Sequence, residues 1–83
     1  MSLNDSTPLQ RTAVTVYPNP FKDELIITSK EIVHYEIVDY QGKIINSGSL
    51  NNKLVIGHEL SKGVYVLKIT KGGKVLQQKI VKE

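Results

Sequence analysis

Apolar and polar residues alternate along most of the chain with a period of two. Such alternation is typical of strands that turn one face to a core and the other to water. No window of eleven or more residues keeps the apolar spacing of an amphipathic helix. The pattern therefore predicts an all-β domain with almost no helix.

Seven short segments have the composition of strands, and turn-forming residues separate them at intervals of about ten residues. They span 13–17, 24–28, 33–39, 43–50, 53–56, 63–70 and 75–82. Seven short antiparallel strands joined by turns indicate a two-layered β-sandwich.

The alternation also predicts which side chains face the core. His34 and Glu36 fall on outward positions of their strand. The predicted inward positions are Val14, Val16, Leu25, Ile27, Val33, Tyr35, Ile37, Tyr65, Leu67 and Ile69.

Two prolines interrupt the pattern in Tyr17-Pro18-Asn19-Pro20-Phe21. Each proline lacks an N–H and forces the residue before it out of the helical region, so the strand ladder cannot continue through them. The motif predicts a rigid corner between the first and second strands.

Glycines mark the turns. Gly42 lies in the turn 40–43, and Gly72 and Gly73 form the turn of the last hairpin. The link 57–62, before Gly63, has room for one helical or 3₁₀ turn.

The chain has 83 residues, which is the size of one small domain. Residues 1–12 are polar and aperiodic, and we expect a disordered linker or an expression remnant there, followed by one domain at 13–83. There is no cysteine, hence no disulfide framework and no thiol nucleophile. No apolar run is long enough to span a membrane, so we expect a domain that is not membrane-embedded.

The net charge of +3 is concentrated at the C-terminal end. Five lysines and one glutamate lie from Lys68 onward, giving +4, whereas residues 1–67 carry six basic and seven acidic groups, giving −1. Arg11 is the single arginine, and no aromatic residue lies among these lysines to stack on bases. Nucleic-acid binding is therefore not expected, and the lysines are typical of a solvated, guarded sheet edge.

The residues needed for catalysis or metal binding are missing. His34 and His58 do not form a ligand pair at metal spacing, and no Gly-x-Ser-x-Gly elbow is present to hold a nucleophilic serine. We expect no enzyme activity, no cofactor and no metal.

Three motifs together resemble one known family. They are the Pro-Asn-Pro corner (Pro18, Asn19, Pro20), Gly42 after a strand that ends in Asp39, and Gly63 and Tyr65 within Leu60-Ser61-Lys62-Gly63-Val64-Tyr65-Val66-Leu67-Lys68-Ile69, before a closing Lys79-Ile80-Val81-Lys82. In this order they resemble the C-terminal sorting domain of the type IX secretion system of Gram-negative bacteria.

The resemblance implies an immunoglobulin-like β-sandwich that acts as a secretion signal. Such a domain directs an upstream passenger protein from the periplasm across the outer membrane. It is recognised by the outer-membrane translocon and then removed by a surface sortase-like peptidase, and the passenger stays on the cell surface or is released.

Within this family reading, the last strand is the expected recognition element. A translocon that accepts unrelated passengers must recognise the signal itself, and a terminal strand can be recognised by strand addition. We predict Lys79, Ile80, Val81 and Lys82 as the recognition segment, supported by Gly63 and Tyr65. For Gly63 and Tyr65 the alternative is a purely structural role in turn and core.

Two other functions remain open at this level. The first is a terminal adhesive or carbohydrate-binding sandwich, although most tyrosines fall on inward positions. The second is a passive structural spacer, which would tolerate changes in its last residues.

Overall fold

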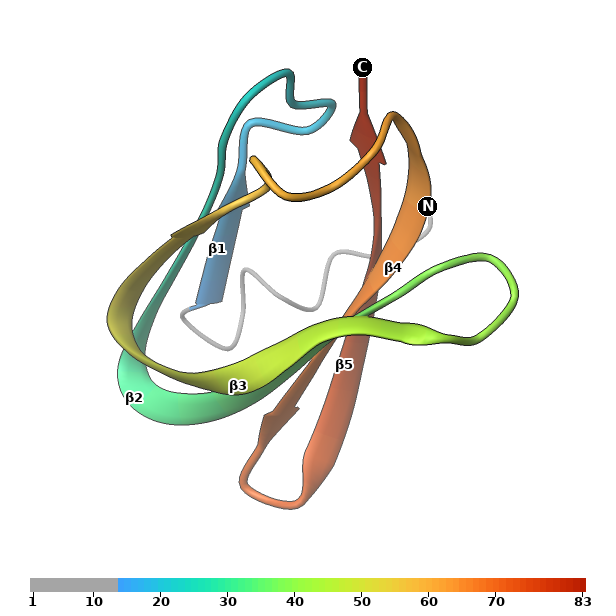
Figure 1. Ribbon diagram of the computed structural model, residues 1–83. Helices are drawn as coiled ribbons and strands as arrows, with labels where there is room; N and C mark the ends of the chain where they lie inside the picture. Colours follow the sequence, from blue (N-terminus) through green and yellow to red (C-terminus); the bar gives the residue numbers. More distant parts are fainter. Residues whose placement is uncertain (1–13) are drawn as a thin grey trace, which may run out of the picture.

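The computed structural model describes residues 14–83, which form five β-strands (Figure 1). The strands are β1 (Val14–Tyr17), β2 (Leu25–Val38), β3 (Ile44–Ile56), β4 (Gly63–Lys71) and β5 (Lys74–Lys82). Each strand pairs with its neighbours in an antiparallel manner, and no helix occurs in this part of the chain. The all-β antiparallel prediction is thus confirmed. The linker expected at 1–12 lies outside the described residues.

Two strands are longer than the sequence pattern predicts. The expected segments 24–28 and 33–39 are the two halves of β2, which has 14 residues. In the same way, 43–50 and 53–56 are joined in β3, which has 13 residues. The prediction of seven strands is therefore wrong, and an immunoglobulin-like sandwich is not confirmed. The domain is one curled sheet of five strands.

β2 continues through the polar residues Lys30 and Glu31 because an irregularity accommodates the bend there. Its pairing with β3 shifts register between Ser29 and Val33. The buried hydroxyl of Ser29 donates to the carbonyl of Glu31 at 2.7 Å and accepts from the N–H of the same residue. These bonds satisfy backbone groups near the irregularity. The polar interruption bends the strand without ending it.

The sheet curls because the two halves of β2 have different neighbours on one edge. The other edge of β2 pairs with β3 along nearly the whole length of both strands. β1 pairs with the first half of β2, β4 pairs with the second half, and β5 follows β4. Figure 1 shows β2 and β3 curving together around the interior.

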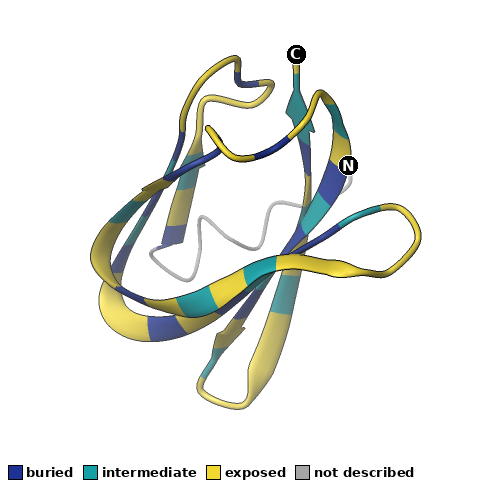
Figure 2. Cartoon of the chain, viewed as in Figure 1, coloured by how far each residue is buried: buried dark blue, intermediate teal, exposed yellow. Residues whose placement is uncertain are grey.

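All five strands and two connections contribute to a single core, and buried positions alternate with exposed ones along the strands (Figure 2). All ten predicted inward residues are buried or half-buried, while His34 is exposed and Glu36 half-buried. The completely buried side chains include Val14, Phe21, Leu25, Ile27, Ile37, Leu67, Ile69 and Ile80. Each contributes about 1.5–3 kcal/mol relative to an exposed position.

The turns form at the predicted glycines. Gly72 and Gly73 have φ of 57° and 82° in the β4–β5 hairpin, and Gly42 has φ of 88° between β2 and β3. The Gly42 N–H donates to the carbonyl of Asp39 at 3.0 Å, and the Asp39 carboxylate accepts two further backbone N–H groups of this turn. The link 57–62 contains no helix.

Candidate recognition segment

The Pro-Asn-Pro corner connects β1 to β2, as predicted, and it also touches the end of β5. The peptide bonds before Pro18 and Pro20 are both cis. The side-chain amide of Asn19 donates to the carbonyl of Lys79 at 2.9 Å and accepts from the N–H of Val81 at 3.1 Å. Asn19 thus bonds the backbone of β5 on the edge that faces away from β4.

Phe21 continues this contact toward the C-terminus. Its N–H donates to the carbonyl of Val81 at 2.9 Å, and its carbonyl accepts from the N–H of Glu83 at 2.8 Å. The two residues Asn19 and Phe21, named here the corner clamp, occupy the outer edge of β5 from Lys79 to Glu83. Strand addition over this stretch would have to displace the corner clamp.

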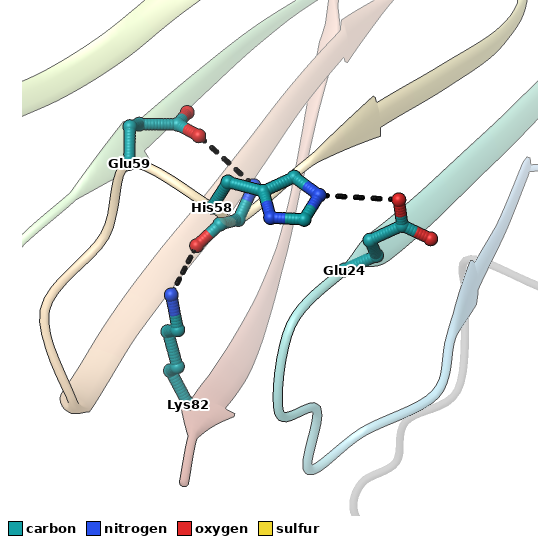
Figure 3. A network of polar contacts seen from close by, with 5 residues as sticks. Glu24, His58, Glu59 and Lys82 are labelled. Carbon is teal, nitrogen blue, oxygen red and sulfur yellow. Dashed lines mark hydrogen bonds and ion pairs between the residues drawn. The ribbon is translucent and has the colours of Figure 1, made fainter.

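The four predicted recognition residues differ in accessibility. Ile80 is completely buried in the core, whereas Lys79 is exposed and Val81 is half-buried. The ammonium group of Lys82 donates to the carbonyl of Leu60 at 2.7 Å. It also donates to the carbonyl of Gly57 (Figure 3). Lys79 and Val81 are therefore the members of the segment that a partner reaches directly, while Ile80 and Lys82 hold the strand in place.

Gly57 must be glycine for two reasons. Its φ is 117°, and a Cβ atom there would lie 2.7 Å from Cε2 of Phe21. Real Cβ atoms do not come this close to a neighbouring carbon. The link after β3 can therefore pack against the corner, and its carbonyl can meet Lys82, only without a side chain at position 57.

A polar network supports this link. The Glu59 carboxylate accepts from the Gly57 N–H at 3.1 Å and from the Asn46 amide at 2.6 Å, and Asn46 in turn accepts from the Tyr35 hydroxyl at 3.1 Å. Partial burial alone would raise the pKa of Glu59, but backbone N–H groups, the Asn46 amide and His58 together lower it. Burial, and then the charge of Glu59, raise the pKa of Tyr35.

Gly63 and Tyr65 lie where β4 begins. Gly63 is opposite Lys82 and Tyr65 is opposite Ile80, so both lie beside the predicted recognition segment. Tyr65 is buried, and its hydroxyl donates to the carbonyl of Ser61 at 2.7 Å. This contact fixes the link 57–62 to β4.

One ion pair in residues 14–83 brings an imidazole next to a carboxylate. His58 lies 3.1 Å from Glu24 (Nε2 to Oε2), and both side chains are more than half exposed (Figure 3). Exposed pairs of this kind contribute little to stability. Within residues 14–83 no three His, Cys, Asp or Glu side chains form a metal-sized cluster, and no helix is long and apolar enough to cross a membrane.

Two features of this site were not predicted from the sequence. Asn19 was assigned to the corner alone, and Lys82 to the recognition segment. Both make contacts with segments far away in the chain, and only the three-dimensional fold reveals them. For Asn19 the sequence signal was its place between two prolines, where the backbone of the residue is held extended.

The sequence from the first strand to the last matches a known family. A family model described as a secretion system C-terminal sorting domain matches residues 15–83. A search of the curated proteins found no match. The matched region includes the corner, the turn at Gly42, the start of β4 and the terminal hairpin. A signal of this kind implies export toward the cell surface or the extracellular space. The chain belongs to the family of type IX secretion C-terminal sorting domains.

Proposed function

We propose that this domain is a non-catalytic secretion signal that directs an upstream passenger across the outer membrane through the type IX secretion system. The match to the sorting-domain family over residues 15–83 is the observation that supports it most strongly. The passenger would pass through the periplasm, and the folded domain would be recognised by the outer-membrane translocon. A surface sortase-like peptidase would then separate the two, leaving the passenger attached or released.

The proposed recognition segment is Lys79, Ile80, Val81 and Lys82. The four residues have two different roles. Lys79 and Val81 face outward, whereas Ile80 and Lys82 hold the strand in place. Deletion of 75–83 should abolish export, but it also removes Ile80 from the core and would unfold the domain. Point substitutions of outward residues are therefore the sharper test of recognition.

The sorting function is tested with a reporter. Residues 13–83 are fused to a monomeric periplasmic reporter in a host that has this secretion system, and the reporter is assayed in the periplasm, on the surface and in the medium. We expect the reporter outside the cell. A reporter that stays in the periplasm would refute the sorting assignment. Substitution of His34 or His58 should leave export unchanged.

Two exposed tyrosines favour a second candidate, a carbohydrate-binding or adhesive module. Tyr17 is 47% and Tyr40 is 86% exposed, and exposed aromatic rings can stack on sugars. They lie on different elements, β1 and the turn after β2, whereas Tyr35 and Tyr65 are buried. Binding on a glycan array that is lost in Tyr40→Ala would support this candidate over the sorting signal.

A further inference from the structure

Branched aliphatic side chains gather on the outer face of the sheet where β2, β3, β4 and β5 lie side by side. Across the strands, Val38 is opposite both Ile44 and Val66. In the next row, Val64 is opposite Val81. Residues opposite each other in neighbouring strands share one face, with Cβ atoms about 4.5–5.5 Å apart. We name these five residues the outer aliphatic patch.

The outer aliphatic patch is not needed to fill the core. On β4, Tyr65 and Leu67 supply the core face, whereas Val64 on the opposite face is 48% exposed. Ile44 is 51% exposed, Val66 and Val81 are half-buried, and Val38, which joins Ile44 to Val66, is only 6% exposed. A contiguous apolar surface on a solvent-exposed face is typical of an interaction site.

The same face becomes more polar along β4 and β5 in the direction of their hairpin. Toward the hairpin, the next row across the strands consists of Ser47, Glu36, Lys68 and Gln77. The row after that consists of Ser49, His34, Thr70 and Val75. Among the rows that include β4 and β5, the two beside the end of β5 are aliphatic; a separate apolar row of Tyr17, Ile26 and Val55 lies across β1, β2 and β3. The patch therefore includes Val81 and borders Lys79, the two accessible members of the proposed recognition segment.

Lys79 adds a positive charge to the border of the patch. It lies opposite Val66, its side chain is exposed, and it makes no ion pair within residues 14–83. Lys68, one row away, has Glu36 opposite it, so its charge is partly balanced. A partner with a carboxylate next to an apolar ridge would complement Val64, Val81 and Lys79 together.

The backbone groups on the outer edge of β5 beside this patch are already hydrogen-bonded, whereas the side chains on the outer face of β5 are accessible. The corner clamp bonds the outward backbone groups from Lys79 to Glu83. A partner that approaches the end of β5 therefore meets side chains on the sheet face rather than free backbone groups. We propose, on the basis of the sorting function proposed above, that the secretion machinery docks on the outer aliphatic patch through an apolar protein surface bordered by carboxylates.

The patch is tested in the reporter fusion with Val64→Thr combined with Val81→Thr. Threonine is a good strand former, and both positions face water, so the fold should be retained. The matched control is Val75→Thr, which changes the same residue type on the same face of β5 at a position that is 57% exposed. We expect export to fall at least about tenfold in the double variant, as for a central interface residue, and to stay unchanged in the control.

The charge is tested separately. Lys79→Glu should reduce export several-fold, and Lys79→Arg should retain it, because arginine keeps the charge. The matched control is Lys74→Glu at the exposed start of β5, which should export like the parent. Normal export of Lys79→Glu would exclude a carboxylate-bordered partner.

A photo-reactive residue at position 64 or 75 identifies the occupant. In exporting cells we expect position 64, and not 75, to crosslink to a protein of the secretion machinery, and Val81→Thr should remove this adduct. An adduct with a second copy of the fusion, or with residues 1–13 of its own chain, would overturn the proposal.

The two levels of the proposal fail differently. If the parent fusion is not exported, the sorting function is wrong, and the docking role falls with it. If the parent is exported and the folded double variant is exported equally, the docking surface is wrong and the sorting function stands. Thermal unfolding verifies the fold. If the double variant melts at a lower temperature than Val75→Thr, the export of the single variant Val64→Thr is used to test the docking surface, since the Val64 side chain is half exposed.

Discussion

Phe21 and Lys82 form a parallel bridge in a domain whose strands pair in an antiparallel manner. The backbone of Phe21 bonds Val81 on one side and Glu83 on the other. The bridge is made by a connection and not by a strand, and it joins the start of the domain to its end. The stability of β5 therefore depends on residues that precede β2.

The first prediction concerns the side chain of Asn19. Asn19→Ala removes two hydrogen bonds to the backbone of β5, and we expect a loss of about 1–2 kcal/mol in the free energy of unfolding, measured with urea. The control is Asn51→Ala on the exposed side of β3, which should change stability by less than about 0.5 kcal/mol. Equal losses in both variants would show that the two Asn19 side-chain bonds add nothing specific to stability.

The second prediction separates crowding from backbone strain. Gly57→Ala and Gly42→Ala both place an alanine at positive φ, but only at position 57 would the new Cβ meet another side chain. We expect Gly42→Ala to cost about 1–2 kcal/mol from strain alone. Gly57→Ala should cost about 1–3 kcal/mol more, because Phe21 must shift within a packed core. Thermal and urea unfolding compare the two, and similar losses would contradict the contact.

The third prediction assigns a structural role to Lys82. Lys82→Met keeps the alkyl chain but leaves the carbonyls of Gly57 and Leu60 without their charged donor. A hydrogen bond to a charged group contributes about 1.5–3 kcal/mol, so we expect a stability loss in this range. Lys79→Met, at an exposed lysine of the same strand, should be close to neutral for unfolding. A neutral Lys82→Met would place its ammonium group in solvent.

The fourth prediction concerns pH. The pKa of Glu59 is lower in the folded domain than its ordinary value of 4.5, since donors from Gly57, Asn46 and its own backbone outweigh partial burial. A carboxyl group with a lowered pKa stabilises the fold above its unfolded pKa, and this contribution is lost as the pH falls through the folded value. We therefore expect the urea midpoint to decline below pH 4.5.

Glu59→Gln isolates this effect. The variant should be less stable than the parent at neutral pH, and the difference between them should shrink as the pH falls below 4.5. Glu36→Gln, on the outer face of β2, controls for the general titration of carboxyl groups. A parent-minus-variant difference that is constant with pH would contradict the role of the Glu59 charge.

The inward side chains could be predicted from the sequence because the period of two depends only on local geometry. Tyr35 and Ile37 on β2, and Leu67 and Ile69 on β4, are buried as the alternation requires. The number of strands could not be predicted in this way. Lys30 and Glu31 have the composition of a turn, but the Ser29 hydroxyl and a shift of register keep the chain extended through them.

The recognition segment at 79–82 stays a prediction, and the sequence alone could indicate only part of how its members are exposed. Alternation around Ile80 separates outward Lys79 and Val81 from the core. It gives no information on Lys82, whose role depends on the link that reaches its ammonium group. It also cannot show that Asn19 lies on the edge of β5, since that contact spans almost the entire domain.

The closure between Phe21 and the end of β5 has a consequence for the order of events during synthesis. β1, the corner and β2 leave the ribosome first, yet β5, the strand that the corner holds, leaves last. Until Ile80 and Lys82 have emerged, the core is open and the corner has nothing to hold. A precursor truncated before these residues could not form the closed sorting domain. A closed domain is therefore possible only after β5 has been synthesised.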